Sequence, residues 1–316
     1  MGRLRFEWLN AFTKRGMDVQ GNPATIAIVS RFPPEKEMKR AASLIGTNMT
    51  SFVMPAKQPD TYYIRHFSPD GKENHVCGHA TVAAAESLAR KFPRYRDGVH
   101  LTFLLNKKYT INDDNAFPAY IKGDEITLTM PAIMGLKEAD ENFHKRLVRA
   151  LGIDRSDIQG TARYAPNIDN YILEIKDPER LQSLTPDFNK LSKLAKSRDY
   201  PHEGIMLTSK ACGGHMDVLT RVFLPVIGVD EDVACGSSMC SVIPYWSAFS
   251  GQAFPPEKTD FVNVFPYPPG GGEGRLGGIQ KVLIDHEKAE IKLTGQATFH
   301  GTVQIPLAEK KIPKGP

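Results

Sequence analysis

The sequence predicts an α+β protein of two similar lobes, in which strands predominate and each lobe surrounds one buried helix. Three observations support this prediction: the length of 316 residues, a motif that recurs half a chain apart, and a helical segment without a polar face. A chain of this length exceeds the usual size of a single domain. We expect the N-terminal lobe to span residues 1–130, with residues 303–316 as a candidate addition, and the C-terminal lobe to span residues 131–302.

The repeated motif is Arg-x-Phe-x-Pro, found at residues 65–69 and again at residues 221–225. A cysteine followed by glycine comes eight residues after the first copy, at Cys77, and ten residues after the second, at Cys235. Acidic residues precede both cysteines. The shared order and spacing indicate that one unit was duplicated.

Two helices are expected to begin at these cysteines. The segment 80–90 is rich in small helix formers and ends in basic residues before a proline, which predicts a helix from near Gly78. Because its first turns carry small or apolar side chains on nearly every side, we expect them to be buried all round. The segment 237–249 is also largely apolar, and Pro244 predicts a kink or a helix end.

Short runs of β-forming residues surround these helices and predict strands. The expected strands are 25–29, 62–65, 101–104, 125–129, 170–174, 282–284 and 289–293. The segments 36–44 and 143–151 predict surface helices. A crossing between the lobes is expected at residues 130–132, which include a proline.

Composition argues against several classes of protein. The 40 basic and 36 acidic residues are spread along the chain without a basic cluster, so we expect no nucleic-acid partner. No run of 18 apolar residues predicts a membrane span, and the N-terminal segment lacks a signal-peptide pattern, so we expect a cytoplasmic protein. The four cysteines are too few and too irregular for a disulfide framework, and we expect reduced thiols.

Cys77 and Cys235 are the candidate catalytic residues. A thiol acts as a base only as thiolate, and the positive end of a helix lowers its pKa. Two facing helix ends would clamp one substrate carboxylate and place a sulfur on either side of its α-carbon. The backbone N–H groups expected to bind that carboxylate are those of Gly78, His79, Gly236 and Ser237.

This geometry suits racemisation or epimerisation of a small carboxylate or amino-acid substrate. One thiolate would remove the Cα proton while a thiol on the opposite face returns one, and N–H donors would stabilise the enolate-like charge. No cofactor is expected, because no nucleotide or pyridoxal signature is present. No metal is expected either, because Cys77 and His79 lack a second pair of ligands with suitable spacing.

Motifs along nearly the whole chain carry a family resemblance. They are Ala11-Phe12-Thr13 leading to Gly21-Asn22-Pro23-Ala24, Phe67-Ser68-Pro69 followed by Cys77-Gly78-His79-Ala80-Thr81, and Glu231-Asp232 followed by Gly236-Ser237 and Tyr245-Trp246-Ser247. With them the chain resembles the phenazine-biosynthesis isomerase (PhzF-like) family, within the diaminopimelate epimerase and proline racemase superfamily. The resemblance implies two similar lobes, each a mostly antiparallel sheet curled around a central helix, with the active site between them.

The family motifs add Asn22 and Asp232 to the residues expected to bind substrate. His79 and Asp232 each have a structural alternative, as the cap of a helix or of a turn. Cys77 and Cys235 have one too, as small buried hydrophobic residues.

Two departures from the family pattern affect the expected chemistry. PhzF-like isomerases usually carry a catalytic Glu in a Ser-Glu-Thr stretch, and the matching segment here places Met49 in that position. A thioether cannot transfer protons. At the second departure, Cys235 stands where PhzF-like proteins more often have another small residue, whereas two-thiol racemases have cysteine at both helix starts.

Three hypotheses follow for function. The first is an amino-acid racemase or epimerase using Cys77 and Cys235, and the second is a PhzF-like double-bond isomerase or dehydratase acting on a small carboxylate. The third is a ligand-binding protein without catalysis, which Met49 keeps open. A homodimer is compatible with the sequence, and nothing in the sequence identifies the substrate.

Overall fold

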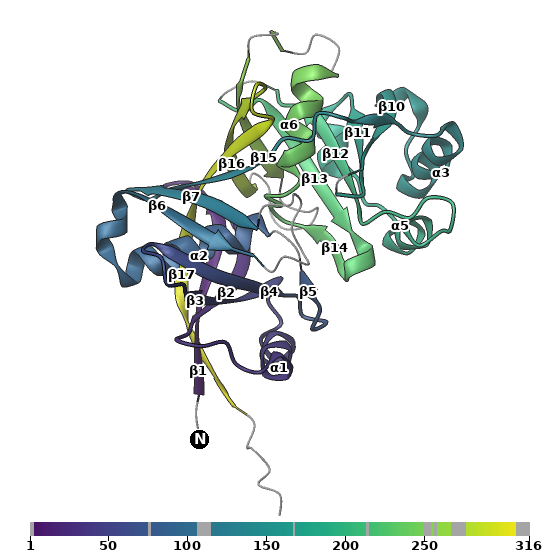
Figure 1. Cartoon of the computed structure of the whole chain (residues 1–316). Coiled ribbons are helices and arrows are strands. Elements are labelled where there is room, and N and C mark those ends of the chain that lie inside the picture. The colour runs from purple at the N-terminus through teal and green to yellow at the C-terminus, as the bar shows by residue number, and fades with distance from the viewer. Residues whose placement is uncertain are drawn as a thin grey trace, which may run out of the picture.

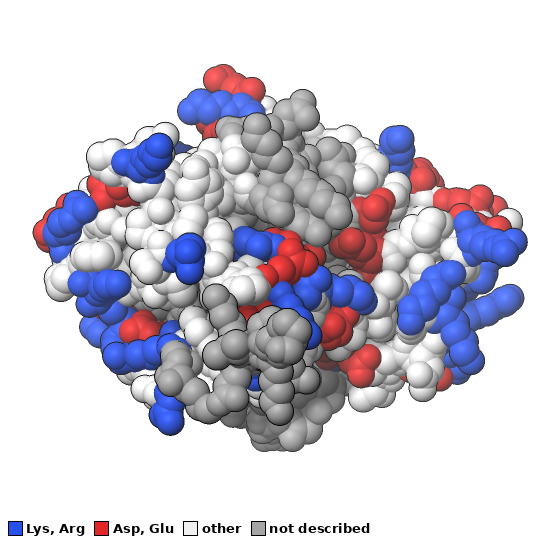
Figure 2. Space-filling view, turned by 60° about the horizontal axis from the view of Figure 1, so that its bottom comes forward, with Lys and Arg blue, Asp and Glu red and all other residues white. Residues whose placement is uncertain are grey.

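The computed structural model describes residues 3–74, 77–105, 115–166, 168–212, 215–249, 254–255, 258–266 and 276–307. Within these residues, seventeen strands surround two buried helices, and smaller helices cover the outside (Figure 1). No helix in the described part of the chain is both long and apolar enough to cross a bilayer. Acidic and basic side chains are interspersed over much of the face in Figure 2, with basic ones gathered at its right-hand edge.

The first half of the chain, together with the last strand β17, forms a closed ring of strands around one helix. The ring runs in the order β1, β2, β3, β4, β6, β7, β8, β17 and back to β1. Its elements are β1 (Arg3–Thr13), β2 (Asn22–Ile28), α1 (Glu35–Ile45), β3 (Met49–Pro55), β4 (Thr61–Phe67), β5 (Glu73–Asn74), α2 (Gly78–Lys91), the 3-10 helix η1 (Pro93–Arg96), β6 (Asp97–Leu104), β7 (Ala116–Lys122) and β8 (Glu125–Pro131).

The second half repeats this order of pairing. As β2 lies parallel to β3 and β4 to β6, so β11 lies parallel to β12 and β13 to β15, and the other strand pairs are antiparallel. Its elements are β9 (Lys137–Glu138), α3 (Glu141–Leu151), η3 (Arg155–Asp157), β10 (Ile158–Ala165), β11 (Asn170–Ile175), α4 (Pro178–Ser183), α5 (Phe188–Ala195), β12 (Gly204–Lys210), β13 (Val218–Leu224), η4 (Pro225–Ile227), β14 (Val229–Asp232), α6 (Met239–Ala248), β15 (Asp260–Pro266), β16 (Leu276–Asp285) and β17 (Glu290–Pro306).

The long strand β17 joins the two halves. Residues 290–295 pair with β8 on one side, residues 290–294 pair with β16 on the other, and residues 296–306 pair with β1. All described strands therefore form one continuous hydrogen-bonded system, a mixed closed barrel extended by a second half, and the predicted separation into two lobes is not distinct. The boundary between residues 130 and 131 stays a prediction. Residues 308–316 of the proposed C-terminal addition lie outside the described residues.

The two central helices begin close to where the sequence predicts them. The first twelve residues of α2 are buried, which confirms a helix enclosed on every side. The second helix, α6, is buried from Met239 to Trp246 and continues through Pro244, where we expected a kink or an end. Pro244 is the sixth residue of a ten-residue helix, so α6 extends only one turn beyond it.

The Arg-x-Phe-x-Pro motif holds the chain that leads to each cysteine. Arg65 on β4 forms two 2.7 Å bonds to the carboxylate of Glu73 on β5, and its guanidinium lies over the ring of Phe67. Arg221 on β13 makes the same two-pronged contact with Glu231 on β14, at 2.7 and 2.8 Å, and lies over Phe223. Such paired hydrogen bonds define the orientation of both groups. The repeat therefore reflects one local structure used twice to position the cysteine that follows.

Candidate active site

The start of α2 and the turn that leads into α6 meet at a pair of glycines. A Cβ atom built on Gly78 would lie 3.0 Å from the Cα of Gly236, and a Cβ on Gly236 would lie 3.0 Å from the Cα of Gly78. A side chain at either position would therefore push the two backbones apart. We predicted that these glycines allow close approach to a ligand; in the structure they allow the two helix starts to approach each other.

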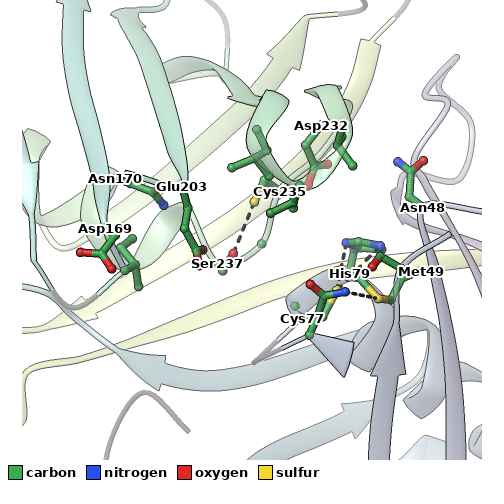
Figure 3. Close-up of a pocket in the computed structure, with 18 residues that line it drawn as sticks. Asn48, Met49, Cys77, His79, Asp169, Asn170, Glu203, Asp232, Cys235 and Ser237 are labelled. Carbon is green, nitrogen blue, oxygen red and sulfur yellow. Dashed lines mark hydrogen bonds between the residues drawn. The ribbon is translucent and has the colours of Figure 1, made fainter. Parts of the chain in front are cut away.

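A cavity of about 260 Å³ opens beside this contact (Figure 3). It is lined by both halves of the chain, and its volume suits a ligand of about the size of one amino acid. The first half contributes Asn48, Met49, Ser68, Asn74, Cys77, Gly78 and His79. The second half contributes Ile168, Asp169, Asn170, Glu203, Leu224, Ile227, Val229, Asp232, Cys235, Gly236 and Ser237.

Both candidate thiols lie in this cavity, each directly before a glycine. Cys77 is the N-cap residue of α2, whereas Cys235 precedes a short turn, residues 236–238, that leads into α6. Cys77 is 8% exposed, and its Sγ lies 3.4 Å from Nδ1 of His79. Cys235 is 6% exposed, and its Sγ lies 3.4 Å from Oγ of Ser237. In Figure 3 the two cysteines lie apart, Cys77 beside His79 and Cys235 hydrogen-bonded to Ser237. The remaining cysteines do not line it: Cys240 is buried in the core, and Cys212 is exposed.

Burial dominates the protonation of both thiols. It raises the pKa of Cys77 well above its usual range, although the backbone N–H of Ala80 acts in the opposite direction, and the charge of Asp232 raises it further. Burial and Asp232 likewise raise the pKa of Cys235 to about 12. We expected the helix ends to lower these pKa values; their N–H groups do so, but by less than desolvation raises them. Both groups are therefore thiols in the ligand-free site at neutral pH.

Asp232 is held in place by a chain of amide hydrogen bonds. Asn22 donates from Nδ2 to Asp232 Oδ1 over 2.5 Å and to the carbonyl of Ala234 over 3.0 Å. Asn48 donates in turn to Oδ1 of Asn22 over 2.9 Å. Asn22 is buried and does not line the cavity, so in the structure it positions Asp232.

His79 lies in the cavity wall as a neutral imidazole. Burial lowers its pKa, and the negative charge of Asp232 only partly offsets that effect. His66, behind it, is fully buried and hydrogen-bonded through Nδ1 to Oγ of Ser51 at 2.8 Å. The described residues contain no group of three or more His, Cys, Asp or Glu side chains arranged to hold a metal ion.

Met49 stands at the start of β3 and lines the cavity as a nearly buried side chain. Its sulfur lies 3.7 Å from Nδ2 of Asn74, a weak contact with a donor. Among the described residues, the first half of the chain therefore contributes no carboxylate to the cavity. The three carboxylates that the described residues place in the wall, Asp169, Glu203 and Asp232, come from the second half.

Sequence reasoning located most of one end of the cavity and missed the other. Of the eight candidate residues, the cavity wall brings together Cys77, Gly78, His79, Asp232, Cys235, Gly236 and Ser237. Asp169, Asn170 and Glu203 were not predicted, because they precede or begin strands without a recognisable motif. The duplication offered one signal, because Asn170 begins β11 as Asn22 begins β2.

Comparison with known proteins gives the family. The model of the PhzC-PhzF family, described as phenazine biosynthesis-like protein, matches residues 9–302. The chain belongs to this family. An uncharacterized isomerase of Halalkalibacterium halodurans is 28% identical over 289 residues, covering 92% of this chain and 93% of that protein. Phenazine biosynthesis-like domain-containing protein 2 of Mus musculus is 27% identical over 259 residues, covering 77% and 83%.

Solved structures of PhzF family proteins share the fold. The protein from Bacillus anthracis superposes with a TM-score of 0.75 at 21% identity, covering 97% of this chain and all of that one. A hydroxyproline epimerase from Agrobacterium vitis, with trans-4-hydroxy-L-proline bound, superposes with a TM-score of 0.57 at 12% identity, covering 96% and 92%. These likenesses confirm the predicted PhzF and diaminopimelate epimerase type of fold. At such identities they concern the fold alone.

Proposed function

We propose that this PhzF-like protein is a cofactor-independent isomerase, and specifically an amino-acid racemase or epimerase whose acid and base are Cys77 and Cys235. The observation that carries the proposal is the placement of both thiols in one cavity, Cys77 at the start of α2 and Cys235 before the turn into α6, with these two segments in contact through Gly78 and Gly236. The names of several relatives, which call them isomerases, support the broader class.

The proposed reaction needs only groups of this chain. Backbone N–H groups at the two helix starts would bind the substrate carboxylate and stabilise the negative charge that develops on it. One cysteine, as thiolate, takes the Cα proton and becomes a thiol, while the other gives its proton to the opposite face and becomes the thiolate. Proton count and charge are conserved, and the reverse reaction uses the two cysteines in exchanged roles.

The burial of the thiols has a mechanistic consequence. Because both resting groups carry protons, one must ionise before the substrate can be deprotonated. The same desolvation makes the thiolate a stronger base once it forms, which suits removal of a weakly acidic Cα proton. The family's usual carboxylate could serve the alternative double-bond isomerisation, but Met49 stands in its place, and no described residue of the first half supplies a carboxylate to the cavity.

Isotope exchange tests the proposal directly. The protein is incubated with a panel of amino acids in deuterated water, and incorporation of α-deuterium is measured by mass spectrometry. Cys77→Ser and Cys235→Ser should each reduce racemisation by at least about 100-fold, the lower end of the contribution of one acid/base group. Cys212→Ser, at an exposed cysteine outside the cavity, is the matched control and should leave the rate unchanged.

The two serine variants should also differ from each other. Each enantiomer is deprotonated by a different cysteine, so residual exchange in Cys77→Ser should favour one enantiomer and residual exchange in Cys235→Ser the other. If either cysteine can be replaced without loss of turnover for both enantiomers, the two-thiol mechanism is wrong. If no amino acid exchanges, the assignment to racemases and epimerases fails.

A further inference from the structure

The two walls of the cavity differ in chemistry, although they come from repeated halves. In the part of the chain that the structure describes, the first-half wall has polar side chains and Met49 but no carboxylate. The second-half wall combines two kinds of surface. Four half-buried aliphatic side chains line it, Ile168, Leu224, Ile227 and Val229, and beside them stand Asp169 and Glu203. No lysine or arginine is among the described residues that line the cavity.

Asp169 and Glu203 form one end of this wall. Asp169 directly precedes β11 and Glu203 directly precedes β12, two strands that pair in parallel, and the N–H of Glu203 donates to the carbonyl of Asp169 over 2.8 Å. The carboxylate of Asp169 accepts a 2.5 Å hydrogen bond from the hydroxyl of Tyr164. Both acidic residues are exposed, whereas Asp232 is buried near the thiols. The cavity therefore has an acidic end separate from its catalytic end.

Asn170 gives independent support for a ligand at this end. Its side chain is 7% exposed and lines the cavity, and among the described residues its buried Oδ1 has no hydrogen-bond partner. In Figure 3 its amide end points from β11 toward the middle of the cavity. In this orientation the oxygen packs against Gly204, and leaving a buried acceptor without a hydrogen bond is costly. A half turn of the amide would bring the oxygen into the cavity, where a bound donor would satisfy it.

In the first half, the two asparagines at the corresponding strand starts are hydrogen-bonded to each other. Asn22 begins β2 and Asn48 precedes β3, as Asn170 begins β11 and Glu203 precedes β12. In the first half, Asn48 donates to Asn22 and Asn22 donates to Asp232, so the amide of Asn22 is satisfied within the protein. In the second half, Asn170 lacks such a partner and a carboxylate replaces the second amide. A donor from a ligand would complete the second half as Asn48 completes the first.

We infer that the second-half wall is a side-chain subsite for a cationic amino acid, one with an aliphatic stem that ends in an ammonium or guanidinium group. The stem packs on Ile168, Leu224, Ile227 and Val229, and the cation binds Asp169, Glu203 and the amide oxygen of Asn170. The inference rests on the proposed racemase or epimerase function, because it places the α-carbon between the two thiols. A ligand of this kind, an α-amino acid of the size of lysine or ornithine, agrees with the volume of the cavity.

Matched ligands test the charge separately from the shape. Lysine and norleucine share a four-carbon stem and differ in the terminal ammonium, and ornithine and norvaline form a shorter pair. We expect kcat/KM for α-deuterium exchange to be at least about tenfold higher for the cationic member of a pair than for its neutral partner. This factor corresponds to the contribution of one hydrogen bond to a charged group. Equal rates for the two members of both pairs would overturn the inference while leaving the proposed function intact.

Variants at the acidic end provide the second test. Glu203→Gln and Asp169→Asn should each lower kcat/KM for the cationic amino acid by about tenfold without changing the value for its neutral partner. Glu287→Gln, at an exposed residue outside the cavity, is the control and should change neither. Equal losses of kcat/KM for cationic and neutral substrates would mean that the two carboxylates do not bind the charged end of the substrate side chain.

Binding separates failure of the subsite from failure of the proposed reaction. In calorimetric titrations of the Cys77→Ser protein, lysine should bind at least about tenfold more tightly than norleucine, and Glu203→Gln in this background should remove the difference. If lysine binds selectively but no exchange occurs in the wild-type protein, the subsite stands and the racemase assignment fails. If the two ligands bind equally, the subsite is refuted whatever the exchange assay shows.

Discussion

The contact between Gly78 and Gly236 can be tested by adding a single methyl group. In Gly78→Ala the new Cβ would lie 3.0 Å from Cα of Gly236 and 3.3 Å from its carbonyl carbon. These neighbours are backbone atoms, which cannot turn away as a flexible side chain can. The segments that carry Cys77 and Cys235 must therefore separate by a few tenths of an ångström.

The expected change in stability is the balance of two opposing terms. Alanine in a helix is favoured over glycine by up to about 1 kcal/mol. Overpacking a filled site costs about 1–3 kcal/mol. We expect Gly78→Ala to lower the free energy of unfolding by up to about 2 kcal/mol. Since a misplacement of about 1 Å can cost about 100-fold in rate, the smaller displacement here should reduce α-deuterium exchange by about threefold to tenfold.

Gly135→Ala provides the matched control, because a Cβ at Gly135 meets nothing within 4 Å. It should be neutral or stabilising by about 0.4–1 kcal/mol, with unchanged exchange. Urea unfolding and the exchange assay are measured for both variants. If Gly78→Ala is as stable as Gly135→Ala and exchanges at the wild-type rate, the two helix starts are not in contact and the reasoning is wrong.

Three further predictions concern protonation and the repeated arginines. Burial lowers the pKa of His66 to about 3, so the stability it contributes is present above pH 6.5 and lost as the pH falls. From pH 7 to pH 5 the free energy of unfolding, measured with urea, should fall by about 2 kcal/mol. An equal fall over this pH range in a His66→Gln variant would contradict the prediction. Because burial raises the pKa of Cys235 to about 12, kcat/KM for exchange should rise about tenfold per unit between pH 7 and pH 9, and a plateau below pH 8 would exclude this thiol as base. Arg221→Met should lower the free energy of unfolding by about 3 kcal/mol, and by more than Arg65→Met does. The reason is that the Arg221 side chain is 2% exposed and also donates to two backbone carbonyls. Equal losses in the two variants would argue against a role for that burial.

Several parts of the fold could be predicted because they depend on local sequence. The helix at Gly78 follows from a run of small helix formers, and burial on all sides follows from its lack of a polar face. The duplication could be recognised at Arg65 and Arg221 because a guanidinium that pairs with a carboxylate through two bonds tolerates few substitutes. In both cases the residues that form the structure lie close together in the sequence.

Other parts depend on contacts between residues far apart in the chain. Nothing near Asn22 in sequence indicates that its amide holds Asp232, more than 200 residues away. The acidic end at Asp169 and Glu203 is likewise created by the pairing of β11 with β12. The pKa of the thiols was expected from the helix ends alone, whereas the depth of the cavity, a tertiary property, decides it.

The path of β17 constrains the order in which this protein can acquire its structure. The ring of the first half closes only when residues 296–306 pair with β1, and residues 290–295 with β8. During synthesis β17 leaves the ribosome after the sixteen described strands that precede it, so the N-terminal half must wait with β1 and β8 unpaired on their outer edges. Pairings over such sequence distances slow folding and leave strand edges exposed to other chains. A shortened chain that ends before Glu290 should therefore aggregate, even though it retains both cysteines and both central helices.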